Sequence, residues 1–576
     1  MLSVENAFAE KFPAFFADAP RLIRQPIIEV LRRLFRETSV NEFLQHNQGV
    51  AGVEFIDKVL EYFSVSYSIS NTSRENIPVS GRVVIFANHP LGALDALCLI
   101  KLVSEVRSDV RIVANEMLTH LEPLGQILLP VDAFAGASTR LQLQAIQSAL
   151  EDEQAVIFFP AGEVSRVRPV GVRDTRWNDG FIKYARRTSS PLLPCYIDAR
   201  NSAFFYGVSA LNKPAAGLLL VNEMFRQRAR NLPIKVGELI PADVIQKDKR
   251  PRAVLLKQVK KHLYRVGKNR SNLFPVEQSI AHPESRQRLK AELAAGQCLG
   301  KTHDQKSIYL MQYQPDSTVI KEIGRLREIS FRKVGEGTGQ RRDLDRYDQD
   351  YEHIVLWDDA DLEVVGAYRV RLGSRASDDL YVSSLFELSA DFAAYSAHGL
   401  ELGRSFVQPR YWGSKALDYL WQGIGAYLYY NPDVRYLFGP VSLSNAYPRG
   451  AVNLIVHFYT VYFGRGDSLV EPRLPYRMSR QEKNELVDIF RGDDYKGEFK
   501  QLKHLLRHYQ VNVPTLYKQY PEVFAPQGVQ FLAWNIDEDF GACIDGFLMA
   551  DLSHLKPSRR KRYIDCHAET GPISHP

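Results

Sequence analysis

The fold of the first half is decided by the stretch VVIFANHPLGALD, residues 83–95. An unbroken apolar run, a turn and a second apolar run at 96–103 are typical of a buried strand that leads into a helix. Similar short apolar runs recur at 111–114, 156–159 and 191–197, with helix-forming segments between them. This alternation predicts an α/β domain with a mostly parallel sheet.

The chain is too long for one hydrophobic core. It has 576 residues, of which 45% are hydrophobic and 24% charged, as in an ordinary globular protein, so disordered and fibrous classes are excluded. Lys and Arg number 73 against 67 for Asp and Glu, which gives a net charge of only +6. The five cysteines lack CxxC spacing, so we expect no metal site, no disulfide framework and a reducing compartment.

No apolar run reaches the length of about 18 residues that a membrane-spanning helix needs, and the N-terminus has no secretory signal. Residues 26–36, however, place apolar residues on one helical face beside three arginines, and residues 247–270 hold ten basic residues and one acid. Core packing and a solvated helix face explain these patterns as well as contact with an anionic membrane surface does. We expect a cytoplasmic protein that lies peripherally on the inner face of a bacterial inner membrane.

The second half has a different pattern of predicted secondary structure. A hairpin is predicted from strands at 354–357 and 364–370, and further strands are predicted at 400–407, 529–534 and 543–550. Antiparallel strands should therefore dominate a mixed α+β domain. The domains that we predict are a helical, membrane-contacting region at 1–70, an α/β domain at 71–280, a linker at 281–305, a second domain at 306–555 and a basic, disordered tail at 556–576.

His89 and Asp95 stand at the carboxyl end of the predicted strand, where ligand sites of open α/β sheets collect. An imidazole that takes a proton from an alcohol needs a carboxylate that fixes its tautomer and stabilises the imidazolium. Asp95 is close enough in sequence to do this. A turn histidine followed by a helix-capping aspartate would give the same pattern.

Four segments, in order, resemble the motif blocks of the glycerophospholipid acyltransferase family: NHPLGALD (88–95), LGQILLPVD (124–132), FFPAGEVSR (158–166) and LLPCY (192–196). This resemblance covers residues 71–270 and implies acyl transfer from a thioester to a lipid hydroxyl. It implies that His89 is the general base, oriented by Asp95. It also implies substrate-binding roles for Asn88, Gly162 and Glu163.

Three departures from the family pattern bear on the acceptor. Five residues separate His89 from Asp95 where the family has four, a form that resembles a haemolysin-like branch, and the acid of the third block is shifted by two positions to Glu163. The second block ends in Asp132 where the family has an arginine that grips phosphate. A lysophosphatidate acceptor is therefore less attractive. A non-enzymatic, haemolysin-like membrane-binding protein is the rival interpretation, which the four ordered blocks oppose.

The second half carries three spaced pairs: Arg327 and Phe331, Asp345 and Asp348, and Glu401 and Arg404. An amino-acid ammonium must lose a proton before it attacks a thioester, and Glu401 is suited to take that proton directly or through water. The two aspartates are suited to cationic groups, and Arg369 or Arg404 to a substrate carboxylate. A salt-bridge lattice that only orders the sheet would use the same residue types.

These pairs resemble the N-acyltransferases that make lyso-ornithine lipid, distant relatives of acyl-homoserine lactone synthases within the GNAT fold. The resemblance implies a GNAT-like mixed sheet in which Glu401 is the catalytic base. It implies substrate-binding roles for the other members of the pairs and for Arg369.

The segment that precedes the predicted helix at 414–429 matches the GNAT phosphate loop at Arg410 and Gly413 and has Lys415 at the third fixed position. Backbone N–H groups at a helix N-terminus favour an anion, such as the phosphate of a pantetheine thioester. We expect acyl carrier protein or CoA as the acyl donor and no bound cofactor. A basic cluster suits an acidic carrier protein or is merely solvated: Lys321, Arg325, Arg332, Lys333, Arg341 and Arg342.

The order of the two domains resembles bifunctional ornithine-lipid synthases. We expect the second domain to transfer a 3-hydroxyacyl group to the α-amine of ornithine, and the first to esterify the new 3-hydroxyl. The alternatives are glycine or another amino acid as headgroup, or a lysophospholipid as the acceptor of the first site. No nucleic acid is expected as a partner.

Overall fold

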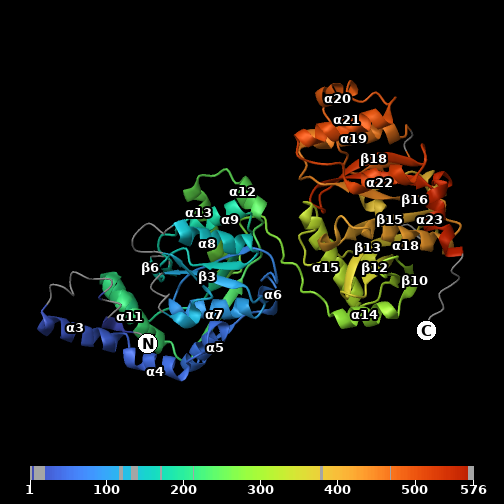
Figure 1. The fold of residues 1–576 in the computed structure, drawn as a ribbon. Helices are drawn as coiled ribbons and strands as arrows, with labels where there is room; N and C mark the ends of the chain where they lie inside the picture. The colour runs from blue at the N-terminus through green and yellow to red at the C-terminus, as the bar shows by residue number, and fades with distance from the viewer. Residues whose placement is uncertain are drawn as a thin grey trace. The chain divides into compact units, whose positions relative to one another are not determined.

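A computed structural model describes residues 3–5, 9, 20–115, 121–131, 140–168, 171–211, 213–375, 380–466 and 469–568. The chain divides into two compact units, Met1–Ser279 and Ile280–Pro576. In each unit helices cover a central sheet (Figure 1). We call them unit 1 and unit 2.

The sheet of unit 1 is parallel except for one pair of neighbours, β8 and β9. In spatial order its strands are β1 (Ser66–Ser68), β9 (Asn231–Val236), β8 (Leu192–Ile197), β2 (Val83–Ala87), β5 (Ala155–Phe158), β3 (Val110–Asn115) and β4 (Leu128–Val131). Every residue of β2 is buried, which explains its unbroken apolar run. The predicted mostly parallel sheet is confirmed.

Alternate residues of β2 enter two cores on opposite faces of the sheet. Val83 and Ile85 pack with the first group of helices, and Val84 and Phe86 with the second. The first group is α5 (Gly52–Phe63) and α7 (Ala93–Ser104), and the second is α8 (Arg140–Glu151), α9 (Gly180–Thr188) and α13 (Arg252–Gly267). The basic stretch at 247–270 thus contains a helix whose apolar side lies in the second core.

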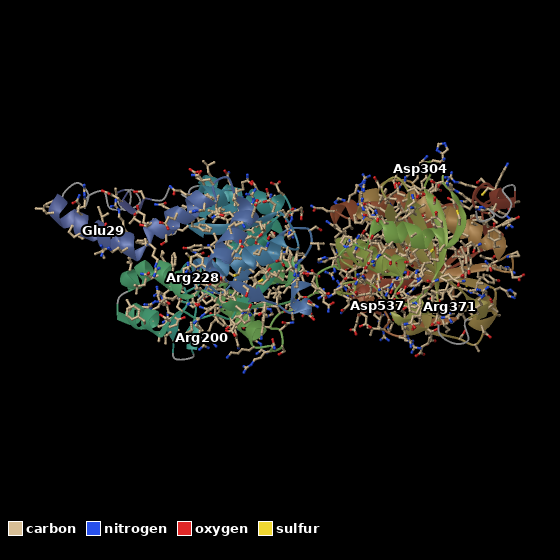
Figure 2. All side chains as sticks on the ribbon, turned by 90° about the horizontal axis from the view of Figure 1, so that it is seen from below. Glu29, Arg200, Arg228, Asp304, Arg371 and Asp537 are labelled. Carbon is tan, nitrogen blue, oxygen red and sulfur yellow. The ribbon has the colours of Figure 1, made fainter. Side chains whose placement is uncertain are left out.

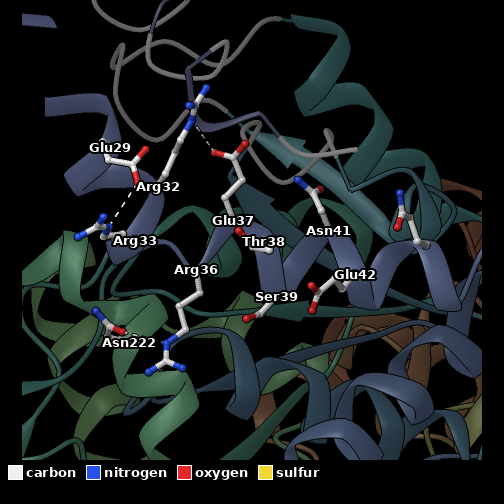
Figure 3. Close-up of a pocket in the computed structure, with 11 residues that line it drawn as sticks. Glu29, Arg32, Arg33, Arg36, Glu37, Thr38, Ser39, Asn41, Glu42 and Asn222 are labelled. Carbon is white, nitrogen blue, oxygen red and sulfur yellow. Dashed lines mark hydrogen bonds and ion pairs between the residues drawn. The ribbon is translucent and has the colours of Figure 1, made fainter. Parts of the chain in front are cut away.

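Two N-terminal helices, α3 (Arg21–Leu34) and α4 (Glu37–His46), adjoin α11 (Lys213–Arg226), which forms a helical pair with α10 (Ala203–Leu211). A polar cavity of about 780 Å³ opens there and includes Arg33, Arg36, Glu42 and Asn222 among its lining residues (Figure 3). Among the described residues, no helix is both long enough and apolar enough to span a membrane.

The sheet of unit 2 is antiparallel except where β15 meets β16. Its order is β10 (Gln297–Lys301), β11 (Ser307–Gln312), β12 (Glu352–Asp358), β13 (Glu363–Leu372), β15 (Gly399–Val407), β16 (Tyr436–Leu443), β19 (Cys543–Asp551) and β18 (Val529–Asp537). The predicted mixed fold is confirmed. β15 and β16 pair over Gly399–Glu401 and Tyr436–Phe438, and Glu401 is the last residue of β15 in this register.

Helices α15 (Thr318–Lys333) and α18 (Ala416–Tyr430) cover opposite faces of this sheet, because their apolar residues enter separate cores. A further helical group follows β16 and packs through α19 on β18 (Figure 1). It consists of α19 (Arg449–Phe463), α20 (Arg480–Val487), α21 (Tyr495–His508) and α22 (Thr515–Val523).

Two boundary predictions are wrong. The segment predicted as a linker at 281–305 holds α14 (Arg286–Ala294) and β10, and Leu289 and Leu293 of α14 are buried in unit 2. The tail predicted to be disordered forms α23 (Pro557–Tyr563) and a short 3-10 helix to Ala568, whereas 569–576 lie outside the described residues. A few buried apolar side chains, such as Tyr563, anchor segments whose composition is mostly polar.

Two candidate active sites

His89 follows β2 directly, and Asp95 lies in the first turn of α7. His89 Nδ1 is 3.2 Å from Asp95 Oδ1. The Asp95 carboxylate is fully buried and also accepts backbone N–H groups from Leu91 and Ala96, each at 2.8 Å. Asp95 therefore caps the helix and also faces the imidazole. The interpretation as a helix cap and the interpretation as a partner of His89 are thus compatible.

The imidazole of His89 is placed to accept a proton. Burial lowers the pKa of His89, but the charges of Asp95 and Asp174 outweigh burial and hold the pKa above its ordinary value. The His89 side chain keeps 19% of its surface exposed, and its ring lies 4.2 Å from the ring of Phe159. Because Nδ1 faces Asp95, Nε2 is the nitrogen available to a substrate hydroxyl.

The other predicted residues of unit 1 have different surroundings. The amide of Asn88 donates to the Ile197 carbonyl and accepts the Ile197 N–H, both at 2.8 Å, so it ties β2 to the end of β8. Gly162 lies in the turn after β5 with φ +62°, and Glu163 pairs with Arg166 at 3.4 Å. Among the described residues, neither a hydrogen bond nor an ion pair joins Gly162 or Glu163 to His89. Asp132 lies outside the described residues.

Unit 2 holds a buried lattice of arginines and aspartates. Arg327 donates to Asp348 at 2.8 Å, and Arg369 donates to Asp345 at 2.6 Å and lies 3.4 Å from Asp348. Arg327 and Arg369 are fully buried. Burial raises the pKa of Asp348, but the two guanidinium groups outweigh burial and hold the pKa well below its usual range. These aspartates thus already have cationic partners within the chain.

A bulge in β15 joins Arg404 to this lattice. The register of β13 and β15 shifts between Ala367 and Arg369, and Arg404 has φ +48° at that place. The Arg404 guanidinium lies 3.3 Å from Asp343 and 4.4 Å from the ring of Phe540. Phe331 packs edge-on against the same ring at 4.9 Å, which brings Phe331 and Arg404 to one place.

Glu401 is the last residue of β15 that pairs with β16. Its buried carboxylate accepts the Tyr351 hydroxyl at 2.5 Å and the Val382 N–H at 2.8 Å. Burial raises the pKa of Glu401 to about 7, although these hydrogen bonds oppose the shift. A carboxylate that titrates near neutral pH is suited to accept and release a proton.

Sequence reasoning missed three more carboxylates near Arg404, namely Glu336, Asp537 and Asp545. Glu336 accepts the hydroxyl of Ser442 at 3.0 Å, and Asp537 accepts the hydroxyl of Tyr381 at 3.4 Å. Burial raises the pKa of each, that of Glu336 to about 7. Repulsion from Asp537 adds to the shifts of Glu336 and Asp545, and repulsion from Asp539 adds to that of Asp537. Their order in the chain gives no signal of this proximity, because they come from different elements.

The predicted phosphate loop leads into α18. Arg410 pairs with Asp361 at 2.6 Å and Glu363 at 2.9 Å, Gly413 has φ +78°, and Lys415 is the exposed N-cap residue. Four members of the basic cluster also pair within the chain: Lys321 with Asp316, Arg325 with Glu322, Arg332 with Glu328 and Arg342 with Glu284. Lys415 thus remains the best placed cation for a phosphate in this loop.

The two candidate sites lie in parts of the chain that match two acyltransferase models. The family model described as acyltransferase matches residues 6–269, and the acetyltransferase (GNAT) domain model matches residues 326–422. A glycine N(alpha)-acyltransferase of Phocaeicola vulgatus is 33% identical over 315 residues, which are 51% of this chain and 95% of the relative. The chain belongs to the aminolipid acyltransferase family.

Two other relatives match with different coverage. A lyso-glycine lipid O-acyltransferase of Phocaeicola vulgatus is 25% identical over 258 residues, which are 44% of this chain and 90% of the relative. An L-ornithine N(alpha)-acyltransferase of Brucella abortus is 31% identical over 143 residues, which are 22% of this chain and 50% of the relative. The chain is an enzyme, so the reading as a non-enzymatic membrane-binding protein is set aside.

Proposed function

We propose that the chain makes a diacylated aminolipid in two steps, with ornithine as headgroup. Unit 2 transfers a 3-hydroxyacyl group to the α-amine, and unit 1 esterifies the new 3-hydroxyl. The observation that carries this proposal is the presence of two separate acid–base centres, His89–Asp95 and Glu401, in one chain. Relatives described as an N-acyltransferase and as an O-acyltransferase, which match 51% and 44% of the chain, support it.

In unit 2 the amine nitrogen attacks the thioester carbonyl. The N–C bond forms, the C–S bond breaks, and the thiolate leaves. Glu401 takes the proton that the amine loses, directly or through water, and its raised pKa suits this exchange. The thiolate then takes up that proton. Arg404 is the cation proposed to hold the substrate carboxylate, since it lies at the bulge in β15, beyond the residues that pair with β16.

In unit 1 the hydroxyl oxygen of the lyso-lipid attacks a second thioester. His89 Nε2 removes the hydroxyl proton as the O–C bond forms, and Asp95 stabilises the imidazolium. The imidazolium then gives its proton to the departing thiolate, so the enzyme returns to its initial state. The acceptor carries no phosphate, which agrees with Asp132 in place of the phosphate-gripping arginine of the family pattern.

The ornithine headgroup is supported by charge. Glu336, Asp537 and Asp545 are carboxylates near one guanidinium, that of Arg404, and burial raises the pKa of each, so further positive charge would favour their ionised forms. The side-chain ammonium of a dibasic amino acid would supply it. Glycine is the second candidate headgroup, favoured by the relative that the chain matches over 95% of its length.

We propose that the acyl donor is a pantetheine thioester, whose phosphate is held by Lys415 and the N-terminus of α18. The carrier protein is the donor that we favour, with CoA as the alternative. Assays of the purified enzyme with the acyl carrier protein thioester and with the CoA thioester, in separate reactions, decide between the two donors.

We also propose that unit 1 works on an anionic membrane surface at the inner face of the inner membrane. Exposed apolar side chains, Leu22, Val30 and Phe204, are 89%, 64% and 57% accessible. Exposed arginines lie on the same unit, including Arg200 and Arg228 (Figure 2). Apolar insertion and attraction to anionic headgroups add up in such a surface. Binding to phosphatidylglycerol vesicles but not to phosphatidylcholine vesicles tests this.

Lipid analysis of a bacterial host that lacks aminolipids tests the function. The wild type should yield the diacylated ornithine lipid, His89→Ala should accumulate the lyso-lipid, and Glu401→Gln should lose both products. His46→Ala and Glu387→Gln, exposed residues of the same two units, are the matched controls and should behave like the wild type.

Other outcomes would redirect the proposal. Glycine lipid in place of ornithine lipid selects the second headgroup. Altered phospholipid chains without any aminolipid would show that unit 1 acts on a lysophospholipid. Unchanged diacylated lipid in His89→Ala would remove the histidine–aspartate mechanism.

A further inference from the structure

Asp174 is a second buried carboxylate beside His89, and neither the sequence motifs nor the proposed chemistry assigns it a role. It follows strand β7 (Gly171–Arg173) and is 4% exposed. Its Oδ1 accepts the Ser165 hydroxyl at 2.5 Å and the backbone N–H of His89 at 3.2 Å, and its Oδ2 accepts the Trp177 indole N–H at 2.9 Å. The carboxylate is thus fixed by three donors.

The network holds His89 from both sides of its backbone. The N–H of Ser165 donates to the carbonyl of His89 at 2.7 Å, while the side chain of Ser165 donates to Asp174. His89 therefore has both of its main-chain polar groups bound within one closed set of hydrogen bonds. Because the side chain is attached to this main chain, the hydrogen bonds also restrict the position of Nε2.

Helix α13 anchors Asp174 in turn. The N–H of Asp174 donates to the Tyr264 hydroxyl at 2.9 Å, and Lys260 Nζ donates to the Asp174 carbonyl at 3.0 Å. Burial lowers the pKa of Lys260, with the charge of Asp174 opposing this shift. Two residues of the basic stretch at 247–270, Lys260 and Tyr264, therefore point into unit 1 and hold the main chain of Asp174.

We propose that Asp174 is a positioning residue for His89 in O-acyl transfer, and that its charge stabilises the imidazolium together with Asp95. This inference rests on the proposed role of His89. Among the described residues, the charged and titratable groups around this pair include Asp95 on α7, Lys260 and Tyr264 on α13, Tyr196 on β8, whose ring lies 5.9 Å from that of Tyr264, and Arg173, whose guanidinium lies 4.8 Å from the Tyr264 ring. His89 thus contacts two carboxylates: Asp95 faces its ring, and Asp174 accepts its backbone N–H.

The test compares O-acylation by Asp174→Asn and wild-type enzyme across pH, with purified lyso-lipid and acyl donor. Asparagine keeps an acceptor oxygen but removes the charge, so the pKa of His89 should fall and the acid limb of kcat/KM should move to lower pH. We expect kcat to fall by roughly tenfold or more with little change in KM, as when groups that orient a catalytic or metal-bound histidine are removed. N-acylation by the same polypeptide should stay unchanged.

Asp179→Asn is the matched control, since Asp179 lies five residues further on and pairs with Lys183 at 2.8 Å. It should leave the pH profile in place. A wild-type profile in Asp174→Asn, with His89→Ala inactive, overturns this inference alone, whereas an active His89→Ala overturns the proposed function. If Asp174→Asn does not fold, Asp174→Glu decides: the inference requires a lower kcat with the acid limb in place, and an unchanged kcat overturns it.

Discussion

The two candidate sites are built in opposite ways. In unit 1 the ring of His89 meets a carboxylate from the same loop and helix turn, since only five residues separate His89 from Asp95. In unit 2 Glu401 and Arg404 come from β15, Arg369 comes from β13 and Asp348 from the short 3-10 helix before β12, so these groups meet only when the mixed sheet has formed. The contact between His89 and Asp95 depends on local geometry, whereas the contacts of the second site depend on the whole sheet.

The two sites should therefore respond differently to mutation, one mainly in activity and the other mainly in stability. Asp95 lies at a strand end and a helix start, where the backbone already offers N–H groups, so its charge is satisfied locally. The lattice aspartates of unit 2, Asp348 and Asp345, are instead paired with the buried guanidinium groups of Arg327 and Arg369, which offset the cost of burying the charges. We therefore expect mutations in unit 1 to affect the reaction first and mutations in unit 2 to affect folding first.

The largest effect is expected from Asp95→Asn. The amide keeps an oxygen for the helix cap but cannot stabilise an imidazolium, so kcat for O-acylation should fall on the order of 1,000-fold. Steady-state kinetics with purified lyso-lipid measures this, and thermal unfolding should show the same midpoint as the wild type. Asp57→Asn, on an exposed carboxylate paired with Lys101, is the control. Full activity of Asp95→Asn would refute the local dyad.

Asp348→Ala should destabilise unit 2 by about 3–5 kcal/mol, because it leaves Arg327 and Arg369 buried without this partner. Urea unfolding, with N-acylation and O-acylation followed separately, measures the loss. Asp361→Ala removes one of the two carboxylate partners of the exposed Arg410 and should cost at most about 1 kcal/mol. Equal effects of the two variants would show that the lattice contributes no more than a surface pair.

The pH dependence of the two reactions should differ. Because burial raises the pKa of Glu401 to about 7, this base is protonated below that pH and N-acylation should decline as the pH falls through 7. O-acylation should decline where His89 becomes protonated, above the ordinary histidine value of 6.5, since Asp95 and Asp174 favour the imidazolium. Initial rates of each half-reaction from pH 5 to 9 measure both limbs. An acid limb of N-acylation that persists in Glu401→Gln would assign it to another group.

The smallest effect is expected from Lys415→Ala. A single exposed cation at a helix N-terminus contributes about 0.3–1 kcal/mol to binding of a phosphate, so KM for the acyl donor should rise roughly two- to fivefold. N-acylation kinetics at low and high salt measures this, and the difference should shrink at high salt. Lys483→Ala, at an exposed lysine of the same unit outside every proposed site, serves as the control.

Much of the fold follows from periodicity. The apolar run at 83–87 and the alternation after it specify a parallel sheet with helices on both faces, and the hairpin signal near 354–370 specifies β12 and β13. The linker and tail predictions failed because composition alone does not show that a few residues, such as Leu289, Leu293 and Tyr563, have partners elsewhere in the chain.

By itself the sequence determined the two classes of domain, the His89–Asp95 pair and the spaced pairs of unit 2, because these depend on short intervals along the chain. Only the tertiary structure decided that Asp174 braces His89, that Asp345 and Asp348 are held by buried arginines, and that Glu401 titrates near neutral pH. The physical reason is burial: desolvation and charge pairing depend on which elements surround a group, and distant segments supply those surroundings.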